Sequence, residues 1–245
     1  MTRRIALLSD AAGYVGPNLS RVLAQREHDL VVGDPTPELL EDLDRLGARV
    51  EVVEGVRDLS KPDSSQRLVQ AALERFGRID SAAAFTGRIA VGRFLRSNVD
   101  DLRIVLKGCV EGPYHFLRAV VPVMVEQRDG QVLVFTSAAG ARPTPGAPLY
   151  SSARAAANML VRNVAAEVAS TGVQVNAVGT NFMDFPEFLK ANRAEDPEGR
   201  ARVEAVVPMG RLGTLDELAH FSAAFIDGTS RFATGQFVAF AGGWA

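Results

Sequence analysis

The sequence predicts an α/β fold in which helices cover both faces of a parallel sheet. Short apolar runs rich in β-branched residues recur along the 245 residues, and segments with apolar side chains at helical spacing lie between them. This alternation is typical of parallel strands joined by crossover helices. Hydrophobic residues make up 47% of the chain, which is enough to bury a full core. No repeat or linker divides the pattern, so we expect a single domain over residues 1–245.

Seven strands are expected, near residues 4–9, 29–34, 49–55, 79–85, 130–137, 172–179 and 235–242. Residues 18–27 and 64–77 place apolar side chains on one helical face, and Gly77 is suited to end the second of these helices. The pattern therefore predicts a Rossmann-like, doubly wound α/β fold with a seven-stranded parallel sheet. Its interruption around residues 180–210 indicates a loop insertion within the domain. Ligands of such sheets bind beyond the carboxyl ends of the strands, so a site is expected there.

Composition and charge exclude several classes of function. The net charge of −2 and the lack of a long basic run argue against nucleic-acid binding as the main role. Cys109 is the only cysteine, which rules out an intrachain disulfide, and the first apolar run is too short for a signal peptide. We therefore expect a cytoplasmic protein without nucleic-acid or membrane partners. His28, His115 and His220 lack metal-ligand spacing, so no metal site is expected.

The stretch TSAAGARPTPGAPLYSSARAA, residues 136–156, contains the most specific pattern in the chain. Ser137 ends a predicted strand, Tyr150 lies thirteen positions later, and Arg154 follows one helical turn beyond. A tyrosine hydroxyl is a poor base near neutral pH, and a positive charge about 4 Å away stabilises its anion by about 4 kcal/mol at an effective dielectric of about 20. The spacing resembles the Ser-Tyr-Lys constellation of enzymes that transfer hydride to and from a nicotinamide cofactor, with arginine replacing lysine.

The first predicted strand-to-helix loop, SDAAGYVGPNLS, departs from a dinucleotide-binding loop. Short-chain dehydrogenases and reductases carry the pattern T-G-x3-G-x-G here, and its glycines let the backbone approach a pyrophosphate. Aligned on Gly16, this chain has Ser9 for the threonine, Asp10 for the first glycine and Tyr14 for the second. A carboxylate that faced the loop would repel phosphate, and the Tyr14 ring would fill space that a cofactor needs.

Three further positions differ from the short-chain dehydrogenases. The turn after the fourth strand reads AFTG at residues 84–87 instead of an asparagine-rich turn, Cys109 aligns with the asparagine of their proton relay, and Arg154 replaces lysine. Asp34 is the best argument for a cofactor, because an acidic residue that ends the second strand contacts a ribose hydroxyl in NAD enzymes. It is also placed to cap the following turn or helix, which is the interpretation we favour.

The first loop and the 136–156 stretch together resemble the halohydrin dehalogenases, relatives of the short-chain dehydrogenases that lack the cofactor. The matching patterns are S-x4-Y-x-G at Ser9, Tyr14 and Gly16, and S-x12-Y-x3-R at Ser137, Tyr150 and Arg154. The resemblance implies a carbon–halogen lyase without cofactor, which converts vicinal haloalcohols to epoxides with halide release. It also implies the reverse ring opening by azide, cyanide, nitrite or halide. It further implies a homotetramer, and apolar residues on more than one face of the 100–127 segment suggest helix pairing between subunits.

The resemblance also implies a role for each site residue. Tyr150 is expected to remove the hydroxyl proton, Arg154 to supply the positive charge, and Ser137 to hold the substrate oxygen. The residues expected to line the halide and substrate pocket are Tyr14, Gly16, Ala139, Thr180, Asn181, Phe182 and Met183. In the 180–183 segment, backbone amides and apolar side chains suit a weakly hydrated anion.

Two alternatives stay open. The first is an NAD(P)-dependent short-chain dehydrogenase or reductase with a degenerate first loop, for which Asp34 is the main support. The second is a non-catalytic binding protein that keeps the fold and does not depend on Tyr150.

Overall fold

The computed structural model describes residues 3–245 and contains a seven-stranded sheet in the order β3-β2-β1-β4-β5-β6-β7. Each strand of this sheet runs parallel to its neighbours. The strands are β1 (Arg4–Leu8), β2 (His28–Gly33), β3 (Val50–Val53), β4 (Ser81–Phe85), β5 (Gly130–Ser137), β6 (Val173–Thr180) and β7 (Phe237–Phe240). The predicted fold class, a Rossmann-like doubly wound sheet, is confirmed.

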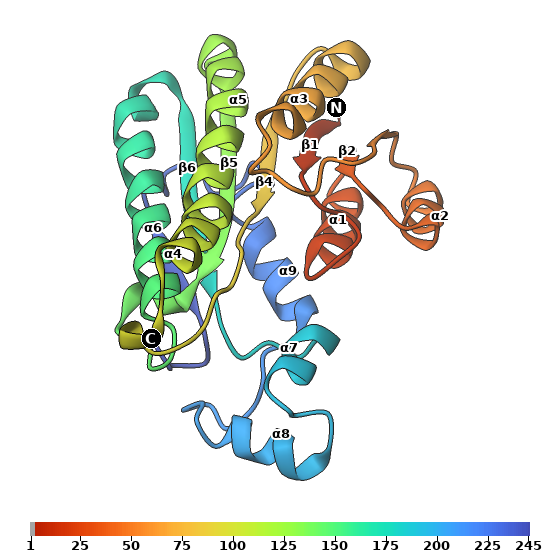
Figure 1. The fold of residues 1–245 in the computed structure, drawn as a ribbon. Coiled ribbons are helices and arrows are strands. Elements are labelled where there is room, and N and C mark those ends of the chain that lie inside the picture. The colour runs from red at the N-terminus through yellow and green to blue at the C-terminus, as the bar shows by residue number, and fades with distance from the viewer. Residues whose placement is uncertain (1–2) are drawn as a thin grey trace.

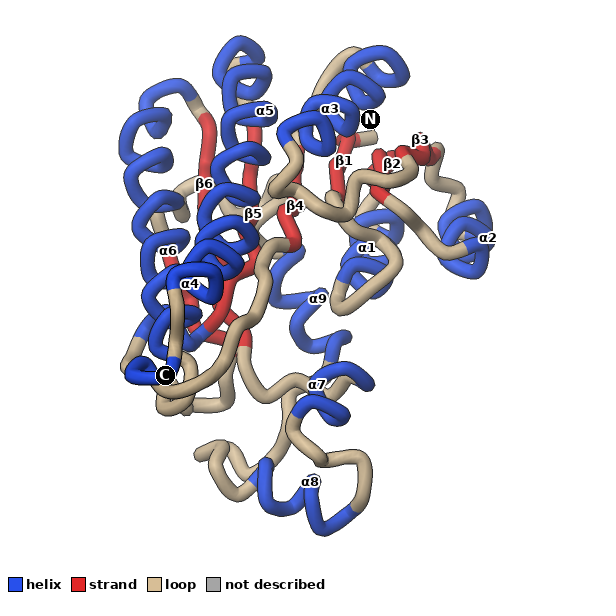
Figure 2. Tube along the Cα trace, in the orientation of Figure 1, coloured by secondary structure: helices blue, strands red, loops and turns tan. Residues whose placement is uncertain are grey.

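Helices cover the sheet on both sides (Figures 1 and 2). They are α1 (Gly16–Gln25), α2 (Pro37–Arg45), α3 (Pro62–Phe76), α4 (Val99–Leu106), α5 (Gly112–Gln127), α6 (Pro148–Val168), α7 (Pro186–Ala191), α8 (Pro197–Glu204) and α9 (Leu215–Ala223). Helices α3, α5 and α6 bury apolar side chains against one face, and α1, α2 and α9 do so against the other. The sheet is therefore the middle of three layers, with a separate hydrophobic core on each side of it.

The local sequence explains why these elements form and end where they do. All eight residues of β5 are buried, because a central parallel strand is covered on both faces. Helix α2 begins after Thr36, whose hydroxyl accepts a hydrogen bond from the Leu39 amide at 3.2 Å. Helix α3 ends at Gly77 as predicted, with φ at 76°, a conformation that glycine adopts without strain.

Asp34 does not cap the following helix. Its backbone φ is 49°, and its carboxylate accepts hydrogen bonds from the backbone amides of Gly55 (2.5 Å), Val56 (2.9 Å) and Arg57 (2.8 Å). The carboxylate thus organises the loop after β3, while Thr36 caps the following helix. The interpretation that Asp34 caps that helix was wrong, because the loop amides come from a segment distant in sequence.

The segment between β6 and α9 carries α7 and α8, which lie beyond the carboxyl end of the sheet (Figure 1). It is anchored by a parallel bridge between Met183 and Gly213 and by an ion pair between Arg200 and Asp184 at 2.5 Å. This end of the molecule therefore carries an extra wall beside the loops that follow β1, β4 and β5. Within residues 3–245, no helix has both the length and the apolar character needed to cross a bilayer.

Candidate active site

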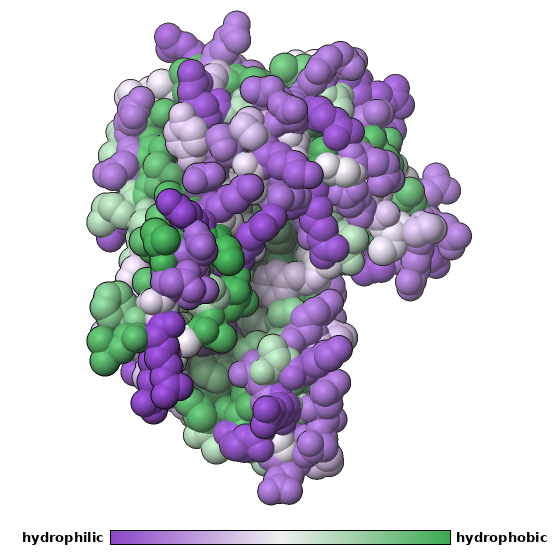
Figure 3. All heavy atoms as spheres, viewed as in Figure 1, coloured by the Kyte–Doolittle hydropathy of each residue, from purple (hydrophilic) through white to green (hydrophobic). Residues whose placement is uncertain are grey.

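A cavity of about 930 Å³ opens at the carboxyl ends of the strands, a volume typical of small-molecule sites. Figure 3 shows this face hollowed beside the α7–α8 segment, with hydrophobic residues along part of the rim. The cavity lies at the switch point between β1 and β4, where doubly wound sheets bind their ligands. It brings together every expected site residue except Gly16, namely Tyr14, Ser137, Ala139, Tyr150, Arg154, Thr180, Asn181, Phe182 and Met183.

Ser137 ends β5, where the strand register places it beside Thr180 at the end of β6. Its hydroxyl donates to the Thr180 carbonyl oxygen at 3.3 Å and accepts from the Ala139 amide at 3.2 Å. Both contacts are local consequences of the strand ending in a short 3₁₀ turn. They hold the Ser137 hydroxyl at the cavity wall.

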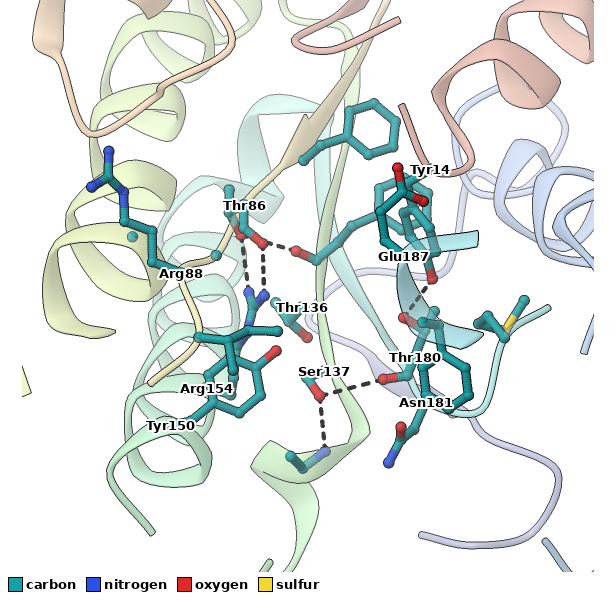
Figure 4. A pocket seen from close by; sticks show the side chains of 18 of the residues that line it. Tyr14, Thr86, Arg88, Thr136, Ser137, Tyr150, Arg154, Thr180, Asn181 and Glu187 are labelled. Carbon is teal, nitrogen blue, oxygen red and sulfur yellow. Dashed lines mark hydrogen bonds between the residues drawn. The ribbon is translucent and has the colours of Figure 1, made fainter. Parts of the chain in front are cut away.

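Tyr150 and Arg154 lie in the first two turns of α6, on the side that faces the cavity. The Arg154 guanidinium carbon lies 5.1 Å from the centre of the Tyr150 ring, within the range of a cation–π contact. Only 5% of the Arg154 surface is exposed, so the charge is held away from bulk water. Figure 4 shows the hydroxyls of Tyr150 and Ser137 facing the same open space.

Thr86, in the turn after β4, binds the Arg154 guanidinium. Arg154 donates from Nη2 to the Thr86 carbonyl oxygen at 2.7 Å and from Nη1 to Thr86 Oγ1 at 3.2 Å. The Thr86 hydroxyl itself donates to the Phe135 carbonyl oxygen on β5 at 2.9 Å. These bonds connect the turn after β4, the strand β5 and the catalytic-site helix α6 (Figure 4).

The first loop is closed by the Asp10 carboxylate. Asp10 Oδ1 accepts hydrogen bonds from the amides of Ala12 (3.0 Å) and Gly13 (3.2 Å), and Oδ2 pairs with Arg57 Nε at 2.6 Å. The Asp10 carboxylate faces the loop, which is the orientation in which it would repel a phosphate, but Arg57 balances its charge. Gly16 packs behind the loop instead of lining the cavity, because a Cβ there would overlap the Asp10 carbonyl oxygen.

Tyr14 lies on the cavity wall opposite Tyr150 (Figure 4). Its hydroxyl donates to Thr180 Oγ1 at 2.6 Å, and its ring lies 4.9 Å from the Phe185 ring and 6.5 Å from the Phe135 ring. Burial raises the pKa of Tyr14, and the hydrogen bond with Thr180 opposes this only in part. Tyr14 is therefore neutral at physiological pH and serves as a wall and a hydrogen-bond donor.

Aromatic side chains make up much of the remaining wall. Phe85 and Phe135 stack with their centres 4.7 Å apart, and Phe182 contacts Trp244 at 5.4 Å. Phe182 has a φ of 56°, an uncommon conformation for a bulky residue, as does Tyr14 with 50°. Such backbone strain persists only where surrounding contacts enforce it, so both aromatic walls are firmly held.

Several cavity residues had no signal in the sequence analysis. Arg57 and Thr136 line the cavity but belong to no motif, and Thr86 lies in the AFTG turn, whose sequence signals only the lack of asparagines. Cys109 is buried within the π-helical turn Lys107–Glu111 and donates from Sγ to the Arg88 carbonyl oxygen at 3.4 Å.

No histidine lies on the cavity wall among residues 3–245. The same residues contain no cluster of three or more His, Cys, Asp or Glu side chains suited to a metal.

Comparison with known proteins gives a consistent family. Residues 11–245 match the family model described as enoyl-(acyl carrier protein) reductase. The chain is 28% identical over 244 residues to the oxidoreductase UcpA of Escherichia coli K12, covering 96% of this chain and 92% of that protein. It is 27% identical over 244 residues to the 3-oxoacyl-[acyl-carrier-protein] reductase FabG of Thermotoga maritima, covering 98% and 97%.

Solved structures agree on the fold. The chain superposes with a TM-score of 0.89 on YwfH, an NADPH-dependent reductase involved in bacilysin biosynthesis, at 18% identity and with coverage of 99% and 98%. It superposes with a TM-score of 0.86 on ElxO with NADP bound, again at 18% identity and with the same coverage.

These relatives correct the functional expectation from the sequence. The matching family is described as a reductase, and the two curated relatives are named as an oxidoreductase and a reductase. The prediction of a cofactor-independent carbon–halogen lyase, a halohydrin dehalogenase acting on haloalcohols and epoxides, was therefore wrong. It rested on a few positions, whereas the reductase match extends over almost the whole chain.

Proposed function

This chain belongs to the enoyl-(acyl carrier protein) reductase family of short-chain dehydrogenases and reductases, and on that premise we propose that it is a nicotinamide-dependent oxidoreductase of small carbonyl or hydroxyl compounds. The observation that carries the proposal is the arrangement of Tyr150 and Ser137 on one cavity wall, with the buried Arg154 cation beside the Tyr150 ring. These groups suit proton exchange with a substrate oxygen.

Tyr150 is the proposed proton carrier. In the reducing direction its hydroxyl gives a proton to the carbonyl oxygen as that oxygen gains negative charge, and in the oxidising direction the phenolate takes the proton back. Arg154 stabilises the phenolate, because its positive charge is buried and close to the ring. Ser137, whose oxygen is held by the Ala139 amide, turns its proton from the Thr180 carbonyl oxygen to the same substrate oxygen and orients it toward Tyr150.

A nicotinamide dinucleotide supplies or accepts the hydride in reactions of this class. The cavity fits such a ligand in place and in volume, since it is at the β1–β4 switch point and measures about 930 Å³. Arg57 and Arg88 line this wall with side chains 60% and 47% exposed, and each is paired with a carboxylate, Arg57 with Asp10 and Arg88 with Asp58. They are the residues that would hold its phosphates in place of those carboxylates.

Asp10 is the feature that fits the cofactor least well. Its carboxylate takes the Ala12 and Gly13 amides that a phosphate would otherwise use, and it holds Arg57 in an ion pair. The expected absence of a cofactor rested partly on this residue. Because Arg57 balances the charge of Asp10, repulsion of a phosphate is weaker than the sequence alone suggested.

The walls favour a substrate with an apolar body. Phenylalanine side chains line the cavity from the ends of β4 and β5 and from the segment after β6, and the Tyr14 ring adds to them. A ketone or secondary alcohol with an aliphatic or aromatic substituent would bury that substituent there while its oxygen contacts Tyr150 and Ser137. The small-molecule partner that we propose is thus a carbonyl compound or alcohol.

The proposal is tested by mixing the purified protein with NADH or NADPH and a panel of aryl and alkyl ketones, and by following dinucleotide oxidation. Secondary alcohols with NAD or NADP test the reverse direction. Tyr150→Phe should lower kcat at least about a hundredfold, since it removes the proton carrier. Tyr114→Phe is the matched control, because Tyr114 is 49% exposed on α5 and should change nothing. Lack of turnover with every pair, in both directions, would refute the proposed function.

A further inference from the structure

We propose that Thr86 is a positioning residue that fixes the Arg154 guanidinium against the Tyr150 ring. The inference rests on the proposed function, in which Tyr150 exchanges the proton. It adds to the site a residue that does not belong to helix α6. Thr86 lies in the turn after β4, whereas Tyr150 and Arg154 lie on α6. Thr86 itself acts only through Arg154.

Thr86 supplies both hydrogen bonds that the guanidinium makes within the described residues. Arg154 donates to the Thr86 carbonyl oxygen at 2.7 Å and to its hydroxyl at 3.2 Å. The third nitrogen, Nε, is buried without a hydrogen-bond partner, and Arg154 takes part in none of the ion pairs found in residues 3–245. A buried charge without a carboxylate partner depends on the neutral dipoles around it, and here Thr86 provides them.

The Thr86 hydroxyl is itself held in a fixed direction. It donates its proton to the Phe135 carbonyl oxygen at 2.9 Å, which leaves its lone pairs free to accept from Arg154. Phe135 lies on the rigid central strand β5, two residues before Ser137. The hydroxyl therefore connects the position of Arg154 to the same strand that positions Ser137.

The backbone of the turn fits closely around the guanidinium. Gly87 has a φ of 134°, and a Cβ at this position would overlap Nη2 of Arg154. Only a glycine leaves room for Arg154 to approach the carbonyl of Thr86. The turn after β4 is thus shaped to receive an arginine.

The distance between the Arg154 guanidinium and the Tyr150 ring affects the proton transfer. The stabilisation of a Tyr150 phenolate falls as the guanidinium moves away or becomes solvated. Without the Thr86 hydroxyl, Nη1 loses an acceptor and Arg154 gains freedom to turn from the ring. Substrate binding should change little, because the Thr86 hydroxyl is already engaged with Phe135 and Arg154.

Thr86→Val and Thr86→Ser form the test pair, because valine keeps the shape without the hydroxyl and serine keeps the hydroxyl. The first readout is the nitrogen-detected NMR spectrum of the arginine side chains, in which Arg154 is assigned by its loss in Arg154→Lys. Wild type and Thr86→Ser should show Arg154 Nη protons in slow exchange with water, and Thr86→Val should show fast exchange. Thr136→Val is the matched control, since Thr136 is a buried threonine on the same wall whose hydroxyl has no hydrogen-bond partner. It should leave the Arg154 signals unchanged.

The second readout is kinetic. Thr86→Val should lower kcat at neutral pH about tenfold with KM within about twofold, and the pH dependence of kcat should shift toward higher pH. Thr86→Ser should restore both. Unchanged Arg154 signals in Thr86→Val would overturn the inference, as would an unshifted pH profile in an active enzyme. If Thr86→Val does not fold, Thr86→Ala takes its place.

The NMR result does not depend on turnover, so the two proposals fail separately. Fast exchange in Thr86→Val, together with no activity in any form of the protein, would refute the proposed function and leave the positioning of Arg154 by Thr86 in place.

Discussion

The Tyr14 hydroxyl donates a hydrogen bond of 2.6 Å to Thr180 Oγ1 and thereby joins the loop after β1 to the end of β6. Tyr14 follows β1 and Thr180 ends β6, so β4 and β5 lie between their strands in the sheet. Thr180 also accepts from Ser137 through its carbonyl oxygen. One residue at the end of β6 therefore fixes both an aromatic wall and the substrate-orienting hydroxyl.

Tyr14→Phe removes this bond while keeping the ring. The variant should lose about 1 kcal/mol of unfolding free energy, because the Thr180 hydroxyl is left without its donor in a partly buried place. Urea denaturation followed by circular dichroism measures the loss. Tyr114→Phe on the exposed face of α5 controls for the general effect of losing a phenol. Equal midpoints for Tyr14→Phe and wild type would show that the bond contributes nothing.

The fold was largely predictable because its signals are local. Strand β5 spans the predicted residues 130–137, since a strand buried on both faces forms a continuous apolar run. The edge strands are shorter than predicted: β3 covers Val50–Val53 instead of 49–55, and β7 covers Phe237–Phe240 instead of 235–242. An edge strand pairs on one side only, so its ladder ends where the single neighbour stops pairing.

The site was predictable only where its residues are close in sequence or end a strand. Tyr150 and Arg154 are one helical turn apart, and the spacing alone brings them together. The contact between Asp10 and Arg57 joins residues 47 positions apart, and that between Arg154 and Thr86 joins residues 68 apart. No periodicity indicates such pairs, so the neutralisation of Asp10 and the role of Thr86 emerge only from the structure. The functional prediction failed for a related reason, since a short motif outweighed similarity spread over the whole chain.

Glu217 gives the protein a pH-dependent contribution to stability. Hydrogen bonds from Arg211 at 2.6 and 2.9 Å, and then from the Thr214 amide at 2.9 Å, hold its pKa at about 2, well below the usual 4.5. A lowered pKa in the folded state stabilises the fold fully above pH 4.5, and this contribution is lost as the pH falls toward 2. Wild type should therefore melt higher than Glu217→Gln at pH 6, with a smaller difference at pH 3.

Calorimetric scans at both pH values measure these melting temperatures. Glu126→Gln is the control, because Glu126 is exposed and takes part in none of the ion pairs of residues 3–245. A difference for Glu217→Gln that is the same at pH 6 and pH 3 would contradict the prediction.

Helix α4 carries an exposed apolar surface, because Val99, Leu102 and Leu106 lie on one side of the helix at intervals of three and four residues. A patch of this kind on a short helix is typical of contact between protein chains. We therefore predict that the protein is a homotetramer whose subunit contacts include this surface, and that Leu102→Glu lowers its mass in multi-angle light scattering. Leu73→Glu on α3 introduces the same charge at a residue of similar exposure and should leave the mass unchanged. A wild-type protein with the mass of one chain at micromolar concentration would contradict this prediction.

Asp10→Ala tests whether the first loop limits dinucleotide affinity. In the wild type the carboxylate occupies the Ala12 and Gly13 amides and pairs with Arg57, so a phosphate must displace it before it can use any of the three groups. Alanine frees these donors and removes a negative charge from the cavity wall. The affinity for NADPH or NADH should therefore increase about tenfold, which corresponds to about 1.4 kcal/mol. Isothermal titration calorimetry measures the change.

The control is Asp42→Ala, which removes an ion-paired carboxylate on α2 that does not line the cavity and should leave the affinity as it is. Weaker binding by Asp10→Ala would mean that the carboxylate itself supports the bound dinucleotide through the loop that it closes, and binding by neither protein at millimolar concentration would argue against a nicotinamide cofactor altogether.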